Sequence, residues 1–301
     1  MIVVVAPGQG SQTPGLLAPW LELDGVADHL ERLSTAAAVD LVELGTAADA
    51  ETIRRTDLAQ PLIVAAGLVA AAALERPIGA VAGHSVGEVT AAVAAGVLTE
   101  EEGMRFIAAR GRAMATAAAA TPTGMSAVVG GDETAVVARI ESLGLVAANR
   151  NGGGQIVASG ALEPLDALRT EPPAGARVIP LQVAGAFHSE HMAPAAAELR
   201  PVADSLSPAD PTARLWSNSD GGEVDSGPRF LELLVGQVAS PVRWDRTMES
   251  FTAAGITGLV ELAPAGTLTG LAKRALRGVP TVAVKTPADL PAARELLDRT
   301  V

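Results

Sequence analysis

A short turn around Ser85 constrains the fold of this 301-residue chain more than any other sequence feature. The turn reads Gly83-His84-Ser85-Val86-Gly87, with an apolar run at 79–82 before it and an alanine-rich segment at 86–95 after it. We predict a strand and then a helix here, so the pattern fits the sharp G-x-S-x-G turn that exposes a nucleophilic serine. The glycines are needed because a side chain would not fit where strand and helix approach each other.

The same residues also allow a simpler interpretation. Ser85-Val86-Gly87-Glu88 has the S-x-x-E pattern of a capping box, in which Ser85 would only satisfy the first N–H groups of the helix. Capping explains the serine and the glutamate, but it requires neither Gly83 nor Gly87. We therefore favour a nucleophile at Ser85.

The first 123 residues alternate short apolar runs with alanine-rich helical stretches, a pattern typical of a sheet covered by helices. From residue 124 the expected order of elements becomes strand, helix, strand, strand, helix, strand, which is the ferredoxin-like signature. Apolar strands and helices resume after residue 185. We therefore predict an α/β protein with a large domain at 1–123 and 186–301, and an inserted ferredoxin-like subdomain at 124–185. The other predicted elements that matter below are the strand 2–6 and the helices 61–73 and 100–119.

Composition excludes several classes of protein. Without cysteine, the chain can form no disulfide, thiolate metal site or cysteine nucleophile. Its formal net charge of −12 and its 2% aromatic content argue against nucleic-acid binding, which needs basic surfaces and stacking side chains. No uninterrupted apolar run reaches about 18 residues, and the N-terminus lacks the basic region of a signal peptide. We expect a cytoplasmic monomer with no membrane contact.

A serine hydroxyl needs a base to take its proton, and the chain has four histidines. We expect His29 to be solvated on a polar helix, and His84 to point away from Ser85 because consecutive residues diverge at a sharp turn. His188 follows a predicted strand, in a loop where catalytic groups often lie, and His191 is expected to open the next helix. A metal site at these last two histidines would need a third ligand at suitable spacing, which the sequence lacks, so no metal is expected.

A serine that attacks a carbonyl group also needs N–H donors where the negative charge develops on the carbonyl oxygen. The turn supplies one, the main-chain N–H of Val86. A second can come from the loop Pro7-Gly8-Gln9-Gly10-Ser11-Gln12, which follows the first predicted strand. A dinucleotide-binding interpretation of this loop fails, because Thr13 stands where the third glycine should be. We expect no cofactor.

Five segments, among them the loop and the turn just described, occur in a fixed order along the chain: Gly8-Gln9-Gly10-Ser11-Gln12, the turn extended to Glu88, Arg110-Gly111, Ala186-Phe187-His188-Ser189, and Gln237 with Ser240-Pro241-Val242-Arg243-Trp244. This ordered set resembles the malonyl-CoA:acyl carrier protein transacylases and the related acyltransferase domains of polyketide synthases, over essentially the whole chain. The resemblance implies a hydrolase-like α/β domain with a mostly parallel sheet and an inserted ferredoxin-like subdomain. It also implies transfer of a malonyl group from malonyl-CoA to an acyl carrier protein, for fatty acid or polyketide synthesis.

The resemblance assigns a role to each catalytic position. Ser85 corresponds to the nucleophile and His188 to its general base. The base is held by a main-chain carbonyl, at the position of Gln237, and this fixes one histidine tautomer. The N–H groups of Gln9 and Val86 correspond to the oxyanion hole.

The resemblance also implies how the substrate is held. Arg110 corresponds to the arginine that binds the free carboxylate of the malonyl group, and a planar guanidinium suits that role. Arg105 and Arg112 lie on the same predicted helix, and only the motif selects Arg110. The other substrate-binding positions are Phe187, Asn151 and Gln60.

Carrier proteins are usually acidic, so docking on this acidic chain would need a local basic patch. The segment 271–277 is our candidate for it, with Lys273, Arg274 and Arg277.

Two other functions compete with this hypothesis. A serine esterase or thioesterase would use a Ser-Asp-His triad, and Asp132 and Asp166 lie between Ser85 and His188 in the required order. Both aspartates fall in the predicted insert, however, where a triad acid is not expected. A non-catalytic docking subunit for a carrier protein would need neither the turn nor His188.

Overall fold

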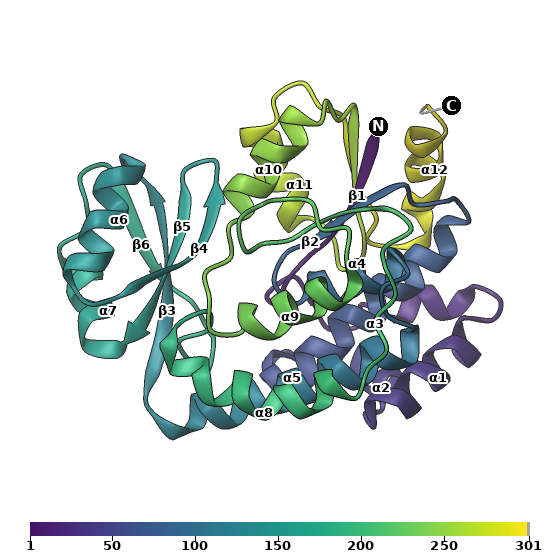
Figure 1. Cartoon of the computed structure of the whole chain (residues 1–301), viewed down its shortest axis with the longest axis horizontal. Coiled ribbons are helices and arrows are strands. Elements are labelled where there is room, and N and C mark those ends of the chain that lie inside the picture. Colours follow the sequence, from purple (N-terminus) through teal and green to yellow (C-terminus); the bar gives the residue numbers. More distant parts are fainter. Residues whose placement is uncertain (300–301) are drawn as a thin grey trace.

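The computed structural model describes residues 1–299 and contains two sheets with helices packed on them (Figure 1). The strands are β1 (Ile2–Ala6), β2 (Ala80–Gly83), β3 (Thr123–Gly130), β4 (Val146–Gly152), β5 (Gln155–Ala161), β6 (Ala176–Pro180), β7 (Arg214–Trp216), β8 (Gly258–Glu261) and β9 (Thr281–Ala283). The α-helices are α1 (Val26–Ala37), α2 (Leu41–Thr46), α3 (Thr56–Leu74), α4 (Gly87–Ala94), α5 (Glu100–Ala120), α6 (Glu133–Ser142), α7 (Leu162–Thr170), α8 (Ala193–Asp204), α9 (Gly227–Gln237), α10 (Trp244–Ala253), α11 (Thr267–Ala275) and α12 (Leu290–Asp298). Short 3₁₀ helices lie at Ala18–Glu22, Thr52–Arg54, Glu190–Met192 and Pro287–Asp289.

The larger sheet has the strand order β7-β2-β1-β8-β9, and every neighbouring pair is parallel. In β1, Ile2 and Val4 point into one hydrophobic core while Val3 and Val5 point into another. Successive strand residues face opposite sides, so burial of both faces explains why the strand is apolar throughout. Helices α3, α4, α5 and α9 lie on one face, and α10 and α11 lie on the other (Figure 1).

The smaller sheet is antiparallel, with the order β4-β5-β3-β6. Helices α6 and α7 pack on one of its faces and form a separate core with it. From the opposite face, Met125 and Val157 pack into the main core together with Phe187. The protein is therefore an α/β fold with a parallel sheet plus an antiparallel sheet that faces it. The domain boundaries at 123/124 and 185/186 stay predictions.

Edge strand β4 is attached to the segment that leads into α10. The N–H of Val242 donates to the carbonyl of Ala148 at 2.8 Å, and the N–H of Arg150 donates back to the carbonyl of Val242 at 2.9 Å. These two bonds fix the antiparallel sheet against the end of the chain that carries α10 and α11.

Helix α3 begins at Thr56, earlier than the predicted start at Pro61. Pro61, where the apolar stretch of the predicted helix begins, lies inside the helix. The full helix has 19 residues and is long and apolar enough to cross a membrane, yet 72% of its most apolar window is buried inside the protein. Its neighbours explain that burial, since α5 and α1 pack beside it.

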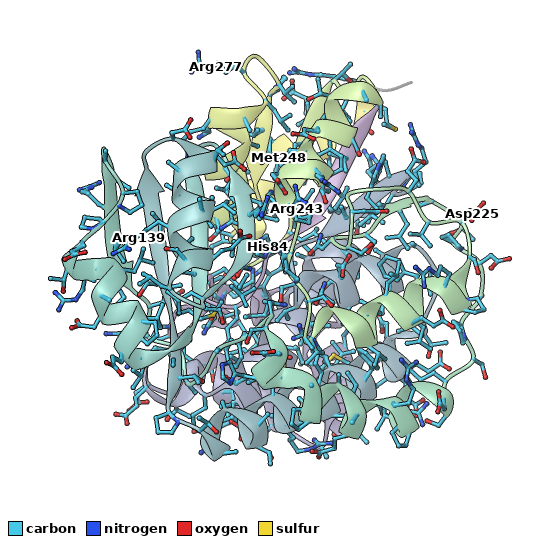
Figure 2. All side chains as sticks on the ribbon, turned by 60° about the vertical axis from the view of Figure 1, so that its left-hand side comes forward. His84, Arg139, Asp225, Arg243, Met248 and Arg277 are labelled. Atoms are coloured by element: carbon cyan, nitrogen blue, oxygen red, sulfur yellow. The ribbon has the colours of Figure 1, made fainter. Side chains whose placement is uncertain are left out.

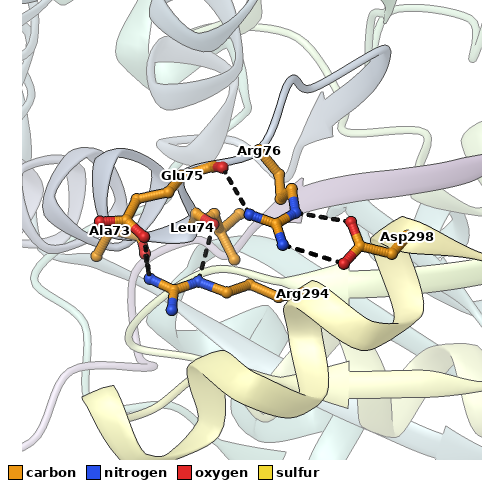
Figure 3. A network of polar contacts seen from close by, with 6 residues as sticks. All are labelled: Ala73, Leu74, Glu75, Arg76, Arg294 and Asp298. Carbon is orange, nitrogen blue, oxygen red and sulfur yellow. Dashed lines mark hydrogen bonds and ion pairs between the residues drawn. The ribbon is translucent and has the colours of Figure 1, made fainter.

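The C-terminal helix α12 is fixed to the end of α3 (Figure 3). Arg294 donates to the main-chain carbonyls of Ala73 and Leu74 at 2.8 and 3.1 Å. The last carbonyl groups of a helix have no hydrogen-bond partner within the helix, and Arg294 provides one for these two. Arg76, just after α3, pairs with Asp298 at 2.6 Å.

The prediction that His29 is solvated on a polar helix is wrong. The side chain is buried, and its Nε2 lies 3.0 Å from the Glu100 carboxylate. His29 falls three positions after Val26 and four before Leu33, and both of these residues are buried. It therefore belongs to the face of α1 that packs inward, not to the solvated face. His191 lies in the 3₁₀ turn just before α8.

Candidate active site

Ser85 lies between β2 and α4 in a strained turn. Its φ of 53° is in the left-handed region, which side chains other than glycine rarely adopt. A Cβ on Gly83 would lie 2.0 Å from the main-chain carbon of Gly87, and a Cβ on Gly87 would lie 2.0 Å from the carbonyl oxygen of Ala6. Both glycines are therefore required by close packing of the strand, the helix and β1.

The hydroxyl of Ser85 does not cap α4, because the N-cap of this helix is Val86 and makes no side-chain hydrogen bond. Instead, Ser85 Oγ lies 2.7 Å from His188 Nε2. On the other side of the ring, His188 Nδ1 lies 2.9 Å from the main-chain carbonyl of Gln237. A carbonyl can only accept, so Nδ1 carries the proton and Nε2 is free to accept the proton of Ser85.

The environment keeps His188 neutral. Burial, and after it the positive charge of Arg110, lower the pKa of His188 to about 3, and the hydrogen bond to Gln237 only partly opposes this. A neutral imidazole at physiological pH is the form that can act as a base.

Arg110 projects from α5 into the same site and is 1% exposed. Its Nη1 donates to Gln60 Oε1 at 2.7 Å, and its Nη2 donates to Gln237 Oε1 at 3.0 Å and to Ser85 Oγ at 3.3 Å. Burial lowers the pKa of Arg110 to about 10, and the Glu88 carboxylate opposes that shift. The guanidinium therefore stays charged at neutral pH, beside the nucleophile.

A cavity of about 220 Å³ opens at this point, between the loops of the parallel sheet and the antiparallel sheet. Met125, Ala127 and Val157 form its apolar wall. The predicted site residues that line it are Ser85, His188, Arg110, Gln9, Val86, Phe187, Asn151 and Gln60. The structure thus brings together residues from six different segments of the chain around one space.

The two N–H groups expected to form the oxyanion hole lie at this cavity. Within residues 1–299, the main-chain N–H groups of Gln9 and Val86 donate to no protein acceptor. Both residues border the cavity, and Val86 directly follows the nucleophile. These donors are therefore available to a bound group.

His84 points away from Ser85 and toward the antiparallel sheet, near the centre of the molecule (Figure 2). Its Nε2 lies 2.8 Å from Asn151 Oδ1, and Asn151 Nδ2 donates to Gln155 Oε1 at 2.9 Å. The Asn151 NH₂ group donates to Gln155, so the Asn151 oxygen is the atom that faces His84, and His84 Nε2 donates to it. A neutral His84 can make this bond. Burial lowers the pKa of His84, consistent with that state.

Two further residues of the site were missed by sequence reasoning, Asn218 and Glu88. Asn218 Oδ1 accepts from the main-chain N–H of Ser85 at 2.8 Å, and Asn218 Nδ2 donates to the carbonyl of Gly83 at 2.8 Å. The sequence did contain a signal for Asn218: a polar segment directly after an apolar strand, at the carboxyl edge of a parallel sheet where sites form.

The sequence places Glu88 in a possible capping box and at the end of the extended turn, but it predicts no role for Glu88 in the site. In the structure it is 1% exposed, its Oε1 accepts from the N–H of Asn218 at 2.6 Å, and its Oε2 accepts from Gln237 Nε2. Burial raises the pKa of Glu88 to about 8, and the bond from the Asn218 N–H opposes this shift. Glu88 is therefore a buried carboxyl group directly beneath the turn.

The aspartates of the competing triad lie elsewhere. Asp132 caps α6 by accepting from the N–H of Ala135 at 2.9 Å, and Asp166 pairs with Arg169 at 2.5 Å on an exposed surface. His188 Nδ1 faces a carbonyl instead of a carboxylate. These residues do not form a Ser-His-Asp triad.

The basic residues considered for docking are exposed on α11 and just after it, at Lys273, Arg274 and Arg277. Arg274 Nε also donates to the carbonyl of Gly153 at 3.2 Å, in the hairpin between β4 and β5. In the part of the chain that the structure describes, no group of three or more His, Cys, Asp or Glu residues is placed to hold a metal ion.

Residues 3–291 match the acyl transferase domain family. The malonyl CoA-acyl carrier protein transacylase of Mycobacterium tuberculosis is 53% identical over 296 residues, covering 96% of this chain and 98% of that protein. A crystal structure of MCAT from the same organism has a TM-score of 0.94 and 51% identity, covering 98% of this chain and 99% of that chain. A malonyl-transacylase in complex with its type II PKS acyl-carrier protein has a TM-score of 0.90 and 31% identity, covering 98% of this chain and 99% of that chain.

Proposed function

This chain belongs to the acyl transferase domain family, and we propose that it transfers a malonyl group from malonyl-CoA to the phosphopantetheine thiol of an acyl carrier protein. The observation that carries the proposal is the 2.7 Å contact between Ser85 Oγ and His188 Nε2, in a cavity that Arg110 also lines. The relatives named for malonyl transfer, one of them in complex with a carrier protein, support the choice of donor and acceptor.

The first half of the reaction forms a malonyl-seryl enzyme. His188 Nε2 takes the hydroxyl proton as Ser85 Oγ attacks the thioester carbon, and the carbonyl electrons move onto oxygen. The N–H groups of Gln9 and Val86 stabilise that oxyanion. When the carbon–sulfur bond breaks, coenzyme A leaves as a thiol with the proton returned by His188.

The second half repeats these steps with the carrier protein. Its thiol gives a proton to His188 and attacks the ester, and the bond to Ser85 Oγ breaks as the hydroxyl regains a proton. Each half exchanges one thioester and one ester, so the reaction runs in both directions by a ping-pong sequence. The Gln237 carbonyl keeps the His188 ring in one tautomer throughout.

Arg110 selects the acyl group. Its guanidinium binds the free carboxylate of malonyl in a bidentate pair, while Gln60 keeps Nη1 in place. An acyl group without this carboxylate would leave a buried charge unpaired, and a site built on such pairing discriminates by about 10⁴. Phe187 and Asn151 limit the width of the cavity around the acyl group.

The carrier protein docks near the mouth of this cavity, on the exposed basic residues of the segment 271–277. Leu271 lines the cavity itself, and Arg274 lies against the hairpin that carries Asn151. Arg277 projects from the periphery of the molecule (Figure 2). An acidic carrier would find complementary charge here on an otherwise acidic protein.

The finer architecture and the location are part of the same proposal. The order β3-α6-β4-β5-α7-β6 and the antiparallel arrangement β4-β5-β3-β6 support a ferredoxin-like subdomain at 124–185. The remainder, 1–123 and 186–301, is a hydrolase-like domain, supported by its parallel sheet and strained nucleophile turn. The protein acts as a cytoplasmic monomer.

The proposal is tested by weighing the intact protein after incubation with malonyl-CoA, and again after addition of a phosphopantetheinylated carrier protein. We expect a gain of one malonyl mass on the enzyme, then its loss with the same gain on the carrier. Ser85→Ala should show neither gain. Release of free malonate without any gain on the carrier would instead indicate a hydrolase.

A further inference from the structure

Glu88 is a buried carboxyl group for which the mechanism above has no use. It is 1% exposed, and within residues 1–299 it is not part of the cavity wall. Its two oxygens accept from the main-chain N–H of Asn218 and from the side-chain amide of Gln237. Burying a carboxyl group is costly unless it is hydrogen-bonded, so its position beneath the active site calls for a physical explanation.

Each of the two partners of Glu88 contacts the active site. Asn218 accepts from the N–H of Ser85 at 2.8 Å, so it holds the backbone of the nucleophile. Gln237 Oε1 accepts from Arg110 Nη2 at 3.0 Å. Glu88 is thus linked to Ser85 through one intervening residue, Asn218, and to the Arg110 guanidinium through another, Gln237.

The Gln237 amide has a donor end and an acceptor end, and its two neighbours need opposite ends. A carboxylate can only accept and a guanidinium can only donate, so only one orientation satisfies both. In that orientation Nε2 faces Glu88 and Oε1 faces Arg110, as the structure shows. The ionised state of Glu88 therefore decides which atom Arg110 meets.

We propose that Glu88 is a positioning residue for the carboxylate-binding arginine: its carboxylate fixes the Gln237 amide, and the amide oxygen holds Arg110 Nη2 where a malonyl carboxylate is bound. This inference rests on the proposed function and adds the group that keeps the selective guanidinium in place. Glu88 touches neither the substrate nor Ser85 Oγ. It acts only through Gln237 and Asn218.

Protonation of Glu88 should switch this arrangement. A protonated carboxyl group becomes a donor toward Gln237, so the amide turns its oxygen to Glu88 and its NH₂ to Arg110, which then loses an acceptor. Within residues 1–299, the charged group acting on Glu88 is Arg110 of α5, and the neutral groups are Ser217, Asn218 and Gln237. Because burial raises the pKa of Glu88 to about 8, the carboxylate forms as the pH rises from 7 to 9.

The substitution Glu88→Gln tests the orientation without changing the shape of the side chain. The new amide oxygen can still accept from the Asn218 N–H, but its NH₂ faces Gln237 Nε2, and two donors cannot pair. The Gln237 amide must turn, so Arg110 Nη2 faces a donor. We expect the enzyme's preference for malonyl-CoA over an acyl-CoA without a carboxylate to fall. The reason is that a hydrogen bond to a charged group contributes more free energy than one between neutral groups.

The experiment compares kcat/KM for malonyl-CoA with kcat/KM for acetyl-CoA, which lacks the carboxylate, at pH 7 and pH 9. In the wild type, the malonyl-to-acetyl ratio should be several-fold higher at pH 9 than at pH 7. In Glu88→Gln it should be at least tenfold below the wild type at pH 9 and should not change with pH. Thermal unfolding of both proteins shows whether the variant is folded.

Glu102→Gln is the matched control. Glu102 also accepts a main-chain N–H from a distant segment, that of Ser207 at 3.1 Å, and it lies in the first turn of α5 on the surface. Its replacement should leave the malonyl-to-acetyl ratio and its pH dependence unchanged.

Equal ratios for the wild type and Glu88→Gln at pH 9 would overturn the inference. If the variant does not fold, Gln237→Met replaces it, because this change removes the amide oxygen that accepts from Arg110 Nη2. A malonyl-to-acetyl ratio equal to that of the wild type would then overturn the inference. Failure of the proposed function is a separate result, because it would appear as a wild type that malonyl-CoA does not acylate.

Discussion

Arg110→Met removes the charge that we assign to the malonyl carboxylate while keeping a long apolar side chain. Arg110 is 1% exposed, so a substrate carboxylate that reaches it is paired away from water. Breaking a buried ion pair by removing one partner costs about 3–5 kcal/mol. At about 1.4 kcal/mol per factor of ten, kcat/KM for malonyl-CoA should fall by a factor between about 10² and about 4 × 10³.

The assay is the rate of acylation measured by rapid quench and intact mass, with malonyl-CoA and acetyl-CoA as donors. Acetyl-CoA lacks the carboxylate, so its rate should change less than about tenfold in Arg110→Met, reflecting the loss of the 3.3 Å contact with Ser85 Oγ and of the positive charge near His188. Arg112→Met, an exposed position on the same helix, is the control and should change neither rate. Equal losses for the two donors in Arg110→Met would refute the reasoning, because Arg110 would then serve the nucleophile and not the carboxylate.

The site leads to four other predictions. Gly87→Ala should lower the thermal unfolding midpoint and abolish acylation, because the new Cβ would lie 2.0 Å from the carbonyl oxygen of Ala6, and an unchanged midpoint would contradict this. Because burial and Arg110 lower the pKa of His188 to about 3, kcat/KM should show no histidine midpoint between pH 6 and 7. The unfolded chain binds this proton near pH 6.5 and the folded protein does not, so His188 should make the wild type about 2 kcal/mol less stable at pH 5 than at pH 7, measured by urea unfolding against His188→Gln. Asp132→Asn and Asp166→Asn should each change transfer by less than about twofold, since neither contacts His188, and a large loss would support the triad.

Local pattern predicted the elements around the nucleophile well. β1 has the expected bounds, Ile2–Ala6, because a strand buried on both faces must be apolar throughout. The helix after Ser85 begins at Gly87, next to its predicted start, since two glycines and a strand leave little freedom there. These are features that a short window of sequence determines.

The remaining features depend on contacts between distant parts of the chain. Asn218 and Ser85 are 133 positions apart, and no periodicity links them. The burial of His29 depends on α5 packing against α1, so its polar neighbours in sequence were misleading. The carbonyl of Gln237 was expected only from family resemblance, and nothing in the sequence indicated that its side chain joins Glu88 to Arg110.

The central claim is that Ser85 becomes the acylated residue because His188 accepts its proton. The most direct measurement is peptide mapping by tandem mass spectrometry after a short reaction with malonyl-CoA, in the wild type and in His188→Ala. We predict the malonyl group on Ser85 in the wild type, and labelling slowed by at least about 10³ in His188→Ala. A malonyl group found on another residue, or labelling of Ser85 at the wild-type rate without His188, would contradict the account.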